Sequence, residues 1–329
     1  MIISRTPTRI SFFGGGTDYP GWYLENGGSV LSTTINKYSY ITVRNLPPFF
    51  DYKHRIRYYE HEETQTLDEI RHPAVREVAK HLKFEGGLEM VHNADLPARS
   101  GLGSSSTFTV GMLHALYALQ GYMPTKRELA ANALVVEQDK IGEIVGSQDQ
   151  IAAAFGGFNH IEFHKGGSFT VNPVTAGPAR LEELQNNLLL CFTGFARTAS
   201  EVAKTQVDKV KINSALLHQM TELTNTGLKI LTNLNQSLDE LGNLLDVQWN
   251  LKRQLSSAVT NDEIDEIYGR GLSAGALGGK LLGAGGGGFM LFYAPRDAHD
   301  KIRSALGEKM FVPFRFENTG SSIVYYSHG

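Results

Sequence analysis

Glycine constrains this chain more than any other residue, because 35 of its 329 residues are glycine and they are concentrated in short segments. An average protein has about 7% glycine. The densest segments are 14–16, 101–103 and 283–288. Glycine adopts backbone conformations that are closed to other residues and lets the backbone approach a ligand closely. The segments therefore predict tight turns and ligand-binding loops.

The overall composition is that of a folded globular protein without strong charge. Hydrophobic residues make up 41% and charged residues 20%, which excludes disorder of the whole chain. The net charge of −3 gives no reason to expect nucleic acid or an anionic membrane as a partner. We expect neither a secretory signal nor a membrane-spanning helix, because no apolar run is long enough. The single cysteine, Cys191, favours a reducing, cytoplasmic location.

The length predicts two domains at roughly 150 residues each. The composition changes near Pro178, so we expect one domain over 1–178 and a second over 179–329. Short β-branched or alternating segments predict strands. In the first half these segments are 39–44, 55–59 and 87–91. The segments 158–163 and 168–174 flank K-G-G at 165–167, which predicts a hairpin.

The second half predicts an α+β arrangement with an antiparallel sheet. A long helical stretch from 200 to 273 is interrupted at Asn213, Asn235 and Asn261. The remaining segments form an expected helix near 297–306 and strands. The expected strands are 188–192, 289–293, 311–316 and 322–326.

Three helix starts are marked by local signals. A helix is expected after Gly103, where an apolar face begins. Thr125 and Glu128 form a capping box, in which each side chain satisfies a backbone N–H of the first turn. The S-x-x-Q pattern that begins at Ser147 predicts a third, shorter helix.

The segment 97–106, with the sequence P-A-R-S-G-L-G-S-S-S, has the properties of a phosphate-binding loop. The glycines allow close approach of the backbone, and the first turn of the following helix offers free N–H groups at its positive end. The serines at 104–106 add hydroxyl groups for phosphate oxygens or Mg²⁺. The alternative is a flexible loop whose serines only cap the helix.

The common nucleotide-binding motifs do not match. A Walker A motif requires G-x4-G-K-[ST], and the sequence around Gly279 and Lys280 lacks it. The segment 283–288 fits G-x-G-x-x-G but precedes an expected strand, so the Rossmann interpretation is rejected. Its glycines indicate backbone packed against a large group or against another glycine-rich loop. The sequence has no H-E-x-x-H motif or Cys/His cluster, so zinc is not expected.

Two carboxylates are candidates for chemistry near the phosphate-binding loop. Asp149 lies at an expected helix start, where the helix dipole favours its charged form, so it could accept a proton or hold a cation. An aspartate that only caps its helix is the commoner case. Glu137 lies near the end of the preceding helix, where a negative charge is unfavourable, and such conflicts occur at functional sites.

Three segments, in this order, resemble the motifs of the GHMP small-molecule kinases. They are 7–19, 97–106 and 282–288, and the resemblance extends over essentially the whole chain. The family resemblance implies a two-domain α+β fold. Its N-terminal domain is like ribosomal protein S5 domain 2, and its C-terminal domain is ferredoxin-like. ATP and substrate would lie in the cleft between the domains.

The resemblance also implies roles for individual residues. Ser105 (or Ser104) and Glu137 match positions that hold Mg²⁺. Asp149 matches the catalytic carboxylate, and Arg9 matches a basic residue beside the transferring phosphoryl group. The residues expected to wrap the ATP phosphates are Gly101, Leu102, Gly103, Ser104, Ser105 and Ser106.

The first glycine segment is similar to the galactokinase motif G-E-H-T-D-Y. The resemblance implies that Asp18 accepts hydrogen bonds from sugar hydroxyls. Gly15 and Gly16 replace Glu and His, and loss of the Glu removes a negative charge near the C6 end of the sugar. That change suits a sugar that extends beyond C6 and carries a phosphate. The other substrate-binding candidates are Thr17, Arg99, Arg197, Gly285 and Gly286.

The segments 9–20, 95–106 and 146–150 most resemble kinases that act on a heptose 7-phosphate. The expected reaction is phosphorylation of the anomeric C1 hydroxyl by ATP to give the 1,7-bisphosphate, which leads to GDP-heptose and surface glycans. The alternatives are a fucokinase- or galactokinase-like enzyme, or a regulator that binds sugar and ATP without catalysis. The oligomeric state and the adenine contacts stay open.

Overall fold

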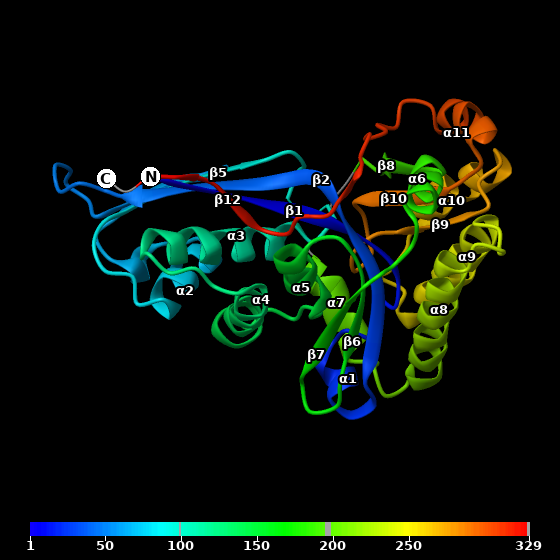
Figure 1. The fold of residues 1–329 in the computed structure, drawn as a ribbon, viewed down its shortest axis with the longest axis horizontal. Coiled ribbons are helices and arrows are strands. Elements are labelled where there is room, and N and C mark those ends of the chain that lie inside the picture. The colour runs from blue at the N-terminus through cyan, green and yellow to red at the C-terminus, as the bar shows by residue number, and fades with distance from the viewer. Residues whose placement is uncertain (99, 195–198, 328–329) are drawn as a thin grey trace.

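The computed structural model describes residues 1–98, 100–194 and 199–327. The described elements form two β-sheets with helices packed around them (Figure 1). Figure 1 shows the larger sheet along the upper side of the molecule, with helices beneath it and the smaller sheet at the right. Arg99 and Arg197, two candidates for phosphate binding, lie outside the described residues.

The larger sheet has the order β12-β1-β2-β5-β3-β4, with β6 and β11 paired to β2 and β7 paired to β6. Strand β2 reaches so many partners because it is 18 residues long: its first part pairs with β6 and its second part with β5. The strands are β1 (Ile2–Phe13), β2 (Gly28–Asn45), β3 (His54–Arg57), β4 (His61–Thr64), β5 (Leu88–Ala94), β6 (Phe158–Phe163), β7 (Phe169–Pro173), β11 (Phe316–Glu317) and β12 (Ser322–Tyr326).

The helices of the first half begin where the local signals predict. Helix α3 begins at Ser104 and α5 at Gln148, directly after Ser147. The capping box at the start of α4 is confirmed, since the backbone N–H of Thr125 donates to the Glu128 carboxylate at 2.8 Å. The helices are α1 (Pro20–Asn26), α2 (Pro73–His81), α3 (Ser104–Leu119), α4 (Lys126–Leu134) and α5 (Gln148–Phe155).

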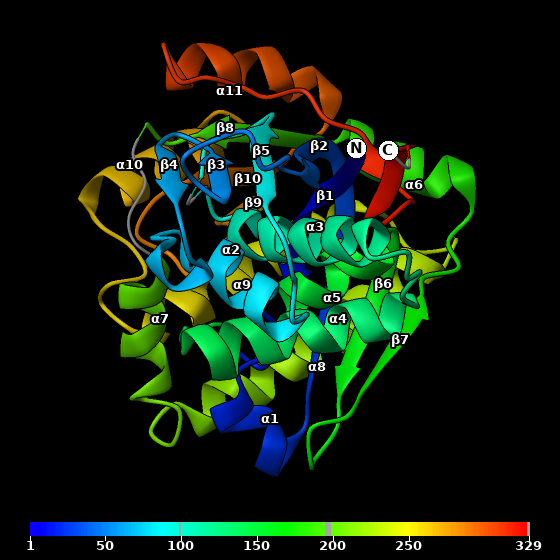
Figure 2. The same cartoon turned by 90° about the vertical axis from the view of Figure 1, so that its left-hand side faces the viewer.

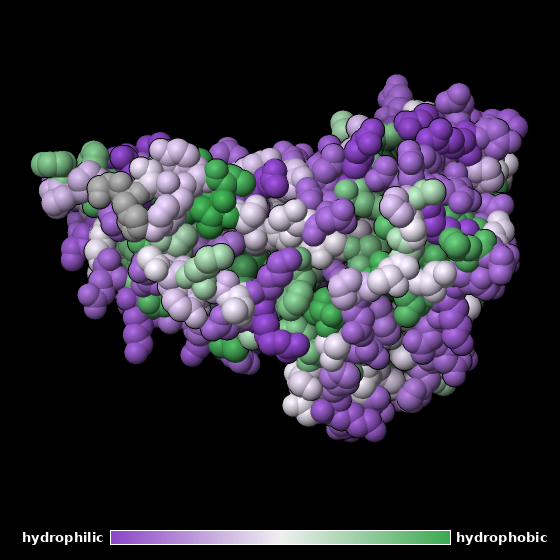
Figure 3. Space-filling view, viewed as in Figure 1, coloured by the Kyte–Doolittle hydropathy of each residue, from purple (hydrophilic) through white to green (hydrophobic). Residues whose placement is uncertain are grey.

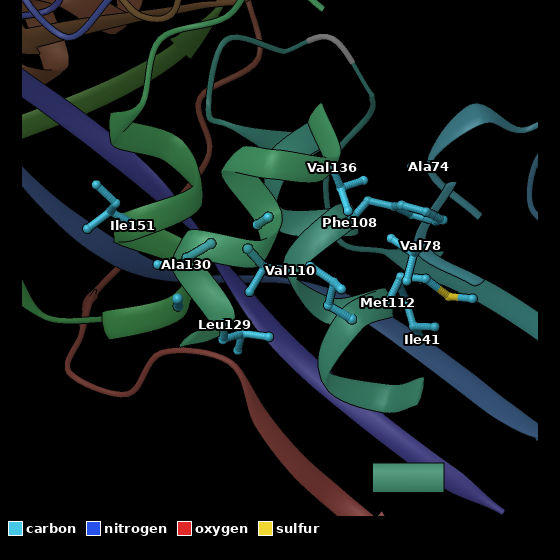
Figure 4. Packing of buried hydrophobic residues seen from close by; sticks show 14 of the residues in the cluster. Ile41, Ala74, Val78, Phe108, Val110, Met112, Leu129, Ala130, Val136 and Ile151 are labelled. Atoms are coloured by element: carbon cyan, nitrogen blue, oxygen red, sulfur yellow. The ribbon is translucent and has the colours of Figure 1, made fainter. Parts of the chain in front are cut away.

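Helix α3 is buried at the centre of this half. Figure 4 shows Phe108, Val110 and Met112 of α3 among side chains from the neighbouring elements, such as Val78 of α2 and Leu129 of α4. A helix that is apolar on nearly every side must be covered by other elements. This packing fixes the position of the α3 N-terminus, where the predicted phosphate-binding loop lies.

The second half contains the smaller, antiparallel sheet, in the order β8-β10-β9. This arrangement confirms the expected α+β fold. The predicted interruptions at Asn213 and Asn261 fall directly before α8 and α10, and the Asn261 side chain accepts from the Ile264 N–H. In the turned view α11 lies at the outside of the molecule (Figure 2).

The strands of the smaller sheet are β8 (Leu188–Phe192), β9 (Gly278–Leu281) and β10 (Phe289–Tyr293). The helices are α6 (Pro178–Asn186), α7 (Ala199–Val207), α8 (Ser214–Thr232), α9 (Asp239–Leu255), α10 (Asp262–Ser273) and α11 (His299–Leu306). Short 3₁₀ segments occur at Leu67–Glu69 and Arg296–Ala298, and a π-helix at Val135–Ile141.

The end of the chain differs from the prediction. The strand expected over 311–316 is mostly irregular, with one isolated bridge at Phe311 and a strand that begins only at Phe316. Pro313 interrupts this segment, because proline has no N–H to donate to a sheet. Strands β11 and β12 then join the larger sheet rather than the smaller one. The domain boundary near Pro178 stays a prediction, since the chain returns across it.

The described residues contain no helix long and apolar enough to cross a membrane. On the face shown in Figure 3, the surface is largely hydrophilic, and apolar residues form separate patches.

Candidate active site

A cavity of about 560 Å³ is lined by residues from both halves of the chain. Residues of β1, the start of α3 and the start of α5 form part of its wall, and α9 and the third glycine segment complete it. The candidates that line it are Arg9, Gly15, Gly16, Asp18, Gly101, Gly103, Ser104, Ser105, Ser106 and Asp149.

The phosphate-binding loop has the conformation that its glycines predict. Gly101 and Gly103 have φ of +81° and +75°, in the left-handed region that favours glycine. Gly103 is the N-cap residue of α3, so the backbone N–H groups of the first helical turn begin directly after it. The Leu102 side chain is buried in the core rather than at the cavity, and its carbonyl accepts from the Arg9 N–H.

Arg9 and Asp149 form an ion pair beside Gly101, the first glycine of this loop. Arg9 Nε lies 2.7 Å from one carboxylate oxygen of Asp149, and Nη2 lies 2.8 Å from the other. A third donor, Nη1, binds the Gly101 carbonyl at 2.7 Å. Arg9 is buried, whereas the Asp149 side chain is 24% exposed and faces the cavity. The pair therefore joins a charged carboxylate to the start of the phosphate-binding loop.

Asp18 is buried beside this pair. It accepts from the Gly16 N–H at 2.9 Å and from Gln148 Nε2 at 2.9 Å, and burial raises its pKa, with Asp149 adding to the effect. Gly146 lies so close that a Cβ there would be 2.0 Å from an Asp18 oxygen. Thr17 does not line the cavity; its hydroxyl donates to the Gly14 carbonyl and holds the turn.

Glu137 is fully buried, in the π-helix, behind the start of α3. The hydroxyl that contacts it is Ser106 Oγ at 2.8 Å, whereas Ser105 is exposed at the cavity. Gln150 also donates to Glu137. Burial raises the pKa of Glu137 to about 7.

The surroundings of Glu137 fit a divalent cation. Its Oε1 is buried without a hydrogen bond of good geometry, although the nearby Thr109 hydroxyl helps to hold down the pKa of Glu137. A buried carboxylate oxygen left in this state is costly unless a cation is near. No group of three or more His, Cys, Asp or Glu among the described residues could hold a metal by itself. Mg²⁺ is commonly bound by one or two carboxylates plus substrate phosphates, so Glu137 with a serine hydroxyl matches such a site.

The third glycine segment packs against the phosphate-binding loop. A Cβ on Gly283 would lie 2.5 Å from Gly101 Cα, and one on Gly288 would lie 2.4 Å from the Ser100 carbonyl oxygen. This contact confirms the expectation of packing against another glycine-rich loop. Gly285 and Gly286 lie away from the cavity wall, against Val259.

Among the cavity residues that sequence reasoning missed are Lys252 and Lys280, which are 3% and 1% exposed. Burial lowers the pKa of Lys252 to about 8, and the positive charge of Arg9 adds to the effect. Its position could have been found from helical spacing, because it follows Leu245 and Trp249 on the buried face of α9. Lys280, in the apolar strand β9, carries no such signal.

An aromatic cluster also lines the cavity. The His72 ring stacks on Phe108 with centroids 4.5 Å apart, and His92 meets the same ring edge-on at 4.8 Å. Burial lowers the pKa of His92 to about 4, so the ring is neutral near pH 7. Tyr58 packs edge-on against His72. Flat neutral rings of this kind can stack with a planar ligand group.

Comparisons with known proteins agree with this fold. Residues 70–157 match the GHMP kinase N-terminal domain and residues 230–312 the GHMP kinase C-terminal domain. The chain is 30% identical to the D-glycero-alpha-D-manno-heptose 7-phosphate kinase of Campylobacter jejuni, over 97% of both chains. It is 29% identical to the bifunctional fucokinase/GDP-fucose pyrophosphorylase of Arabidopsis thaliana, over 92% of this chain and 31% of that protein.

The crystal structure of a D-glycero-D-manno-heptose 1-phosphate kinase from Bacteroides thetaiotaomicron has the same fold. It superimposes with a TM-score of 0.82 over all of both chains, at 24% identity. The chain therefore belongs to the GHMP kinase family and is a sugar kinase, an enzyme that transfers a phosphoryl group from ATP.

Proposed function

We propose that this kinase phosphorylates the anomeric C1 hydroxyl of D-glycero-D-manno-heptose 7-phosphate to give the 1,7-bisphosphate, on the route to GDP-heptose and surface glycans. The observation that carries the proposal is the position of Asp149, which faces the cavity between the phosphate-binding loop and Asp18. The heptose 7-phosphate kinase from C. jejuni, similar over nearly the full length of both chains, supports this acceptor.

In the proposed complex, the triphosphate lies on the first turn of α3. The free N–H groups there and the hydroxyls at 104–106 suit phosphate oxygens. The base would then lie toward Tyr58, His72 and Phe108, whose rings line the same cavity. The sugar would lie near Asp18, with the anomeric hydroxyl toward Asp149.

The transfer forms a bond between the anomeric oxygen and the γ-phosphorus. The bond from that phosphorus to the β,γ-bridging oxygen breaks, and its electrons leave on ADP. The hydroxyl proton passes to the Asp149 carboxylate and then to solvent. Arg9 holds Asp149 in place through two hydrogen bonds and adds positive charge where negative charge develops.

Glu137 and the hydroxyl of Ser105 or Ser106 would hold Mg²⁺. When bound, the ion would neutralise charge on the β- and γ-phosphates. The buried Glu137 Oε1, which lacks a hydrogen bond of good geometry, supports this assignment. Ser106 is the hydroxyl already bonded to Glu137, whereas Ser105 (or Ser104) is the one that the family pattern matches.

Gly15 supports an acceptor that carries a second phosphate. A Cβ at this position would have Gln148 Nε2 as its nearest neighbour, at 3.6 Å, so the absence of a side chain is not forced by packing. A carboxylate here would repel a phosphorylated sugar.

We also propose a cytoplasmic location, in keeping with the single, buried Cys191.

The test is a coupled ADP-release assay of the purified enzyme with heptose 7-phosphate, heptose, fucose, galactose and mevalonate. Phosphorus NMR of the product identifies the phosphorylated carbon. We expect the highest kcat/KM with heptose 7-phosphate and a new phosphate on C1. A ratio near one between heptose 7-phosphate and heptose would reject recognition of the second phosphate.

A fucokinase is the second candidate, because the Arabidopsis relative is a bifunctional fucokinase. The same assay distinguishes the two candidates, because a fucokinase would have its highest kcat/KM with fucose, which carries no phosphate. A regulator without catalysis would release no ADP with any sugar. Asp149 and Arg9 line the cavity, and Glu137 lies directly behind its wall, bonded to Ser106; this arrangement argues against that alternative.

A further inference from the structure

Two buried lysines in the cavity wall lack a carboxylate partner. Neither Lys252, in the last turn of α9, nor Lys280, in β9, forms an ion pair among the described residues. Lys252 Nζ donates to the carbonyls of Leu281 and Gly283 instead. Lys280 Nζ donates to the Phe12 carbonyl at 3.0 Å.

The charges around these lysines do not balance within the protein. Arg9, Asp18 and Asp149 are the charged groups that influence Lys252. Arg9 and Asp149 neutralise each other through their two-point ion pair, so Asp18 is the remaining carboxylate among the groups that act on Lys252. Burial lowers the pKa of both lysines, that of Lys280 well below its usual value. A buried cation is costly unless an anion lies near it. An anionic group bound in the cavity would therefore stabilise the charged form of Lys252.

The position of Lys252 indicates that this anion is a phosphate group bound at the phosphate-binding loop. Its carbonyl partner Gly283 packs directly against Gly101, whose own carbonyl accepts from Arg9. The Arg9 guanidinium and the Lys252 ammonium are thus anchored on two loop residues that touch. Both cations therefore lie where the phosphate-binding loop begins, close to the carboxylate of Asp149.

We propose that Lys252 contacts the phosphoryl group during its transfer and acts as a second catalytic cation beside Arg9. The inference rests on the proposed phosphoryl transfer, although it does not depend on which sugar is the acceptor. The bond changes are those given above; the lysine supplies only charge and a hydrogen bond. Negative charge spreads over three oxygens of the transferring group, and a fixed cation stabilises it there.

Lys280 is a positioning residue in this arrangement. Its bond to the Phe12 carbonyl holds the end of β1, directly before the turn that carries Asp18. Burial and the neighbouring charge of Lys252 lower the pKa of Lys280 well below its usual value, so Lys280 acts through this hydrogen bond rather than through a fixed charge.

The experiment compares Lys252→Met, which removes the charge, with Lys252→Arg, which keeps it. Arg253→Met is the matched control, because it removes a cation at the next position of α9, where Arg253 pairs with Asp265 outside the cavity. We expect Lys252→Met to lower kcat by about 10²- to 10³-fold, with a small change in KM for the sugar. Lys252→Arg should recover part of the loss, and Arg253→Met should resemble the wild type.

Each variant is assayed with the phosphorylated and the unphosphorylated form of the best sugar. An equal loss of kcat with both forms supports contact with the transferring group. A loss confined to KM for the phosphorylated form would overturn the proposal and assign Lys252 to the second phosphate of the acceptor. A kcat close to wild type for Lys252→Met would reject both roles.

A binding measurement covers the case in which Lys252→Met is poorly folded. The probe is ADP with aluminium fluoride, Mg²⁺ and the sugar, because aluminium fluoride imitates the transferring phosphoryl group. Calorimetry on Lys252→Gln should show weaker capture of this complex but unchanged affinity for ADP alone. Unchanged capture would overturn the proposal. If the wild type prefers another sugar, the proposed acceptor fails, and Lys252 is tested with that sugar.

The pH dependence of kcat/KM gives a further readout, because this ratio reports the free enzyme. The pKa of Lys252 is about 8, owing first to burial, and the groups that face it are Arg9, Asp18, Asp149 and Lys280. Lysine is charged below its pKa, so kcat/KM should fall as the pH rises through about 8. Lys252→Arg should keep its kcat/KM to higher pH, because guanidinium stays protonated. The same fall in both enzymes would contradict the proposal.

Discussion

The Arg9 guanidinium holds the Asp149 carboxylate at two points, through nitrogen–oxygen contacts of 2.7 and 2.8 Å. Such a planar, two-point pair fixes the orientation of the carboxylate as well as its charge. Arg9 is itself fixed by the Gly101 carbonyl, so the reacting carboxylate and the phosphate-binding loop share one support. Small changes on either side should therefore affect catalysis.

Asp149→Asn should lower kcat by about 10²- to 10⁴-fold, because the amide cannot accept the hydroxyl proton. ATP should still bind, since the start of α3 is unchanged. Steady-state ADP release gives kcat, and calorimetry gives the ATP affinity. If the variant retained more than about a third of the wild-type kcat, Asp149 would not be the base.

Gly103→Ala should impair catalysis beyond its cost in stability. A Cβ there would lie 3.2 Å from an Asp149 oxygen and 3.4 Å from Arg9 Cγ. Gly121 has almost the same φ, +76° against +75°, but no atom within 4 Å of such a Cβ. Gly121→Ala is therefore the matched control for backbone strain, which costs about 1 kcal/mol in either variant.

Urea unfolding should show a similar decrease in the free energy of unfolding for both alanine variants. Only Gly103→Ala should lose most of its kcat/KM. Equal activity in the two variants would show that the Gly103 position does not constrain the Arg9–Asp149 pair.

Gly15→Glu should lower kcat/KM for phosphorylated acceptors more than for unphosphorylated ones. The new carboxylate would enter beside Gln148, which donates to Asp18, and would repel a second phosphate. Gly15→Gln adds the same bulk without the charge. We expect the ratio of kcat/KM for heptose 7-phosphate over heptose to fall about tenfold more in the Glu variant, or about 1.4 kcal/mol. If both variants gave the same ratio, the phosphate would be recognised elsewhere.

Acid should destabilise the fold through a partly buried histidine, His114. Burial lowers the pKa of His114 from 6.5 to about 4. Between these values the unfolded chain binds a proton that the folded chain does not, so stability falls as the pH drops from about 6.5 to 4. One such group contributes about 1.4 kcal/mol per pH unit in that window.

His114→Gln should reduce this slope relative to the wild type. Urea unfolding at several pH values across the window measures both slopes. An unaltered slope in His114→Gln would mean that His114 titrates alike in the folded and unfolded states.

Local signals predicted the elements around the phosphate-binding loop well. Gly103 and the serines after it mark the start of α3, and Thr125 with Glu128 marks α4. The segments 158–163 and 168–174 correspond to β6 and β7, which pair antiparallel as the predicted hairpin requires. These signals succeed because a helix start or a hairpin depends on residues close together in the sequence.

Local sequence signals could not predict contacts between segments that are far apart in the sequence. Residues 2–13 form a strand that lacks regular alternation, because most of its side chains are buried on both faces. Successive residues of a helix point in directions about 100° apart, so the pattern S-S-S does not tell which hydroxyl faces Glu137. The structure shows that this is Ser106. Lys280 was missed because a lysine inside an apolar strand has no sequence signature of its surroundings.

Strand β1 pairs with β12 on one side and with β2 on the other. During synthesis on the ribosome, β2 follows β1 soon afterwards, whereas β12 emerges only after the whole second half of the chain. One side of β1 therefore stays unpaired while most of the polypeptide is being made, and such an open edge can pair with other chains. Completion of the larger sheet is thus a late event in biosynthesis, and truncation before Ser322 should yield an aggregation-prone product.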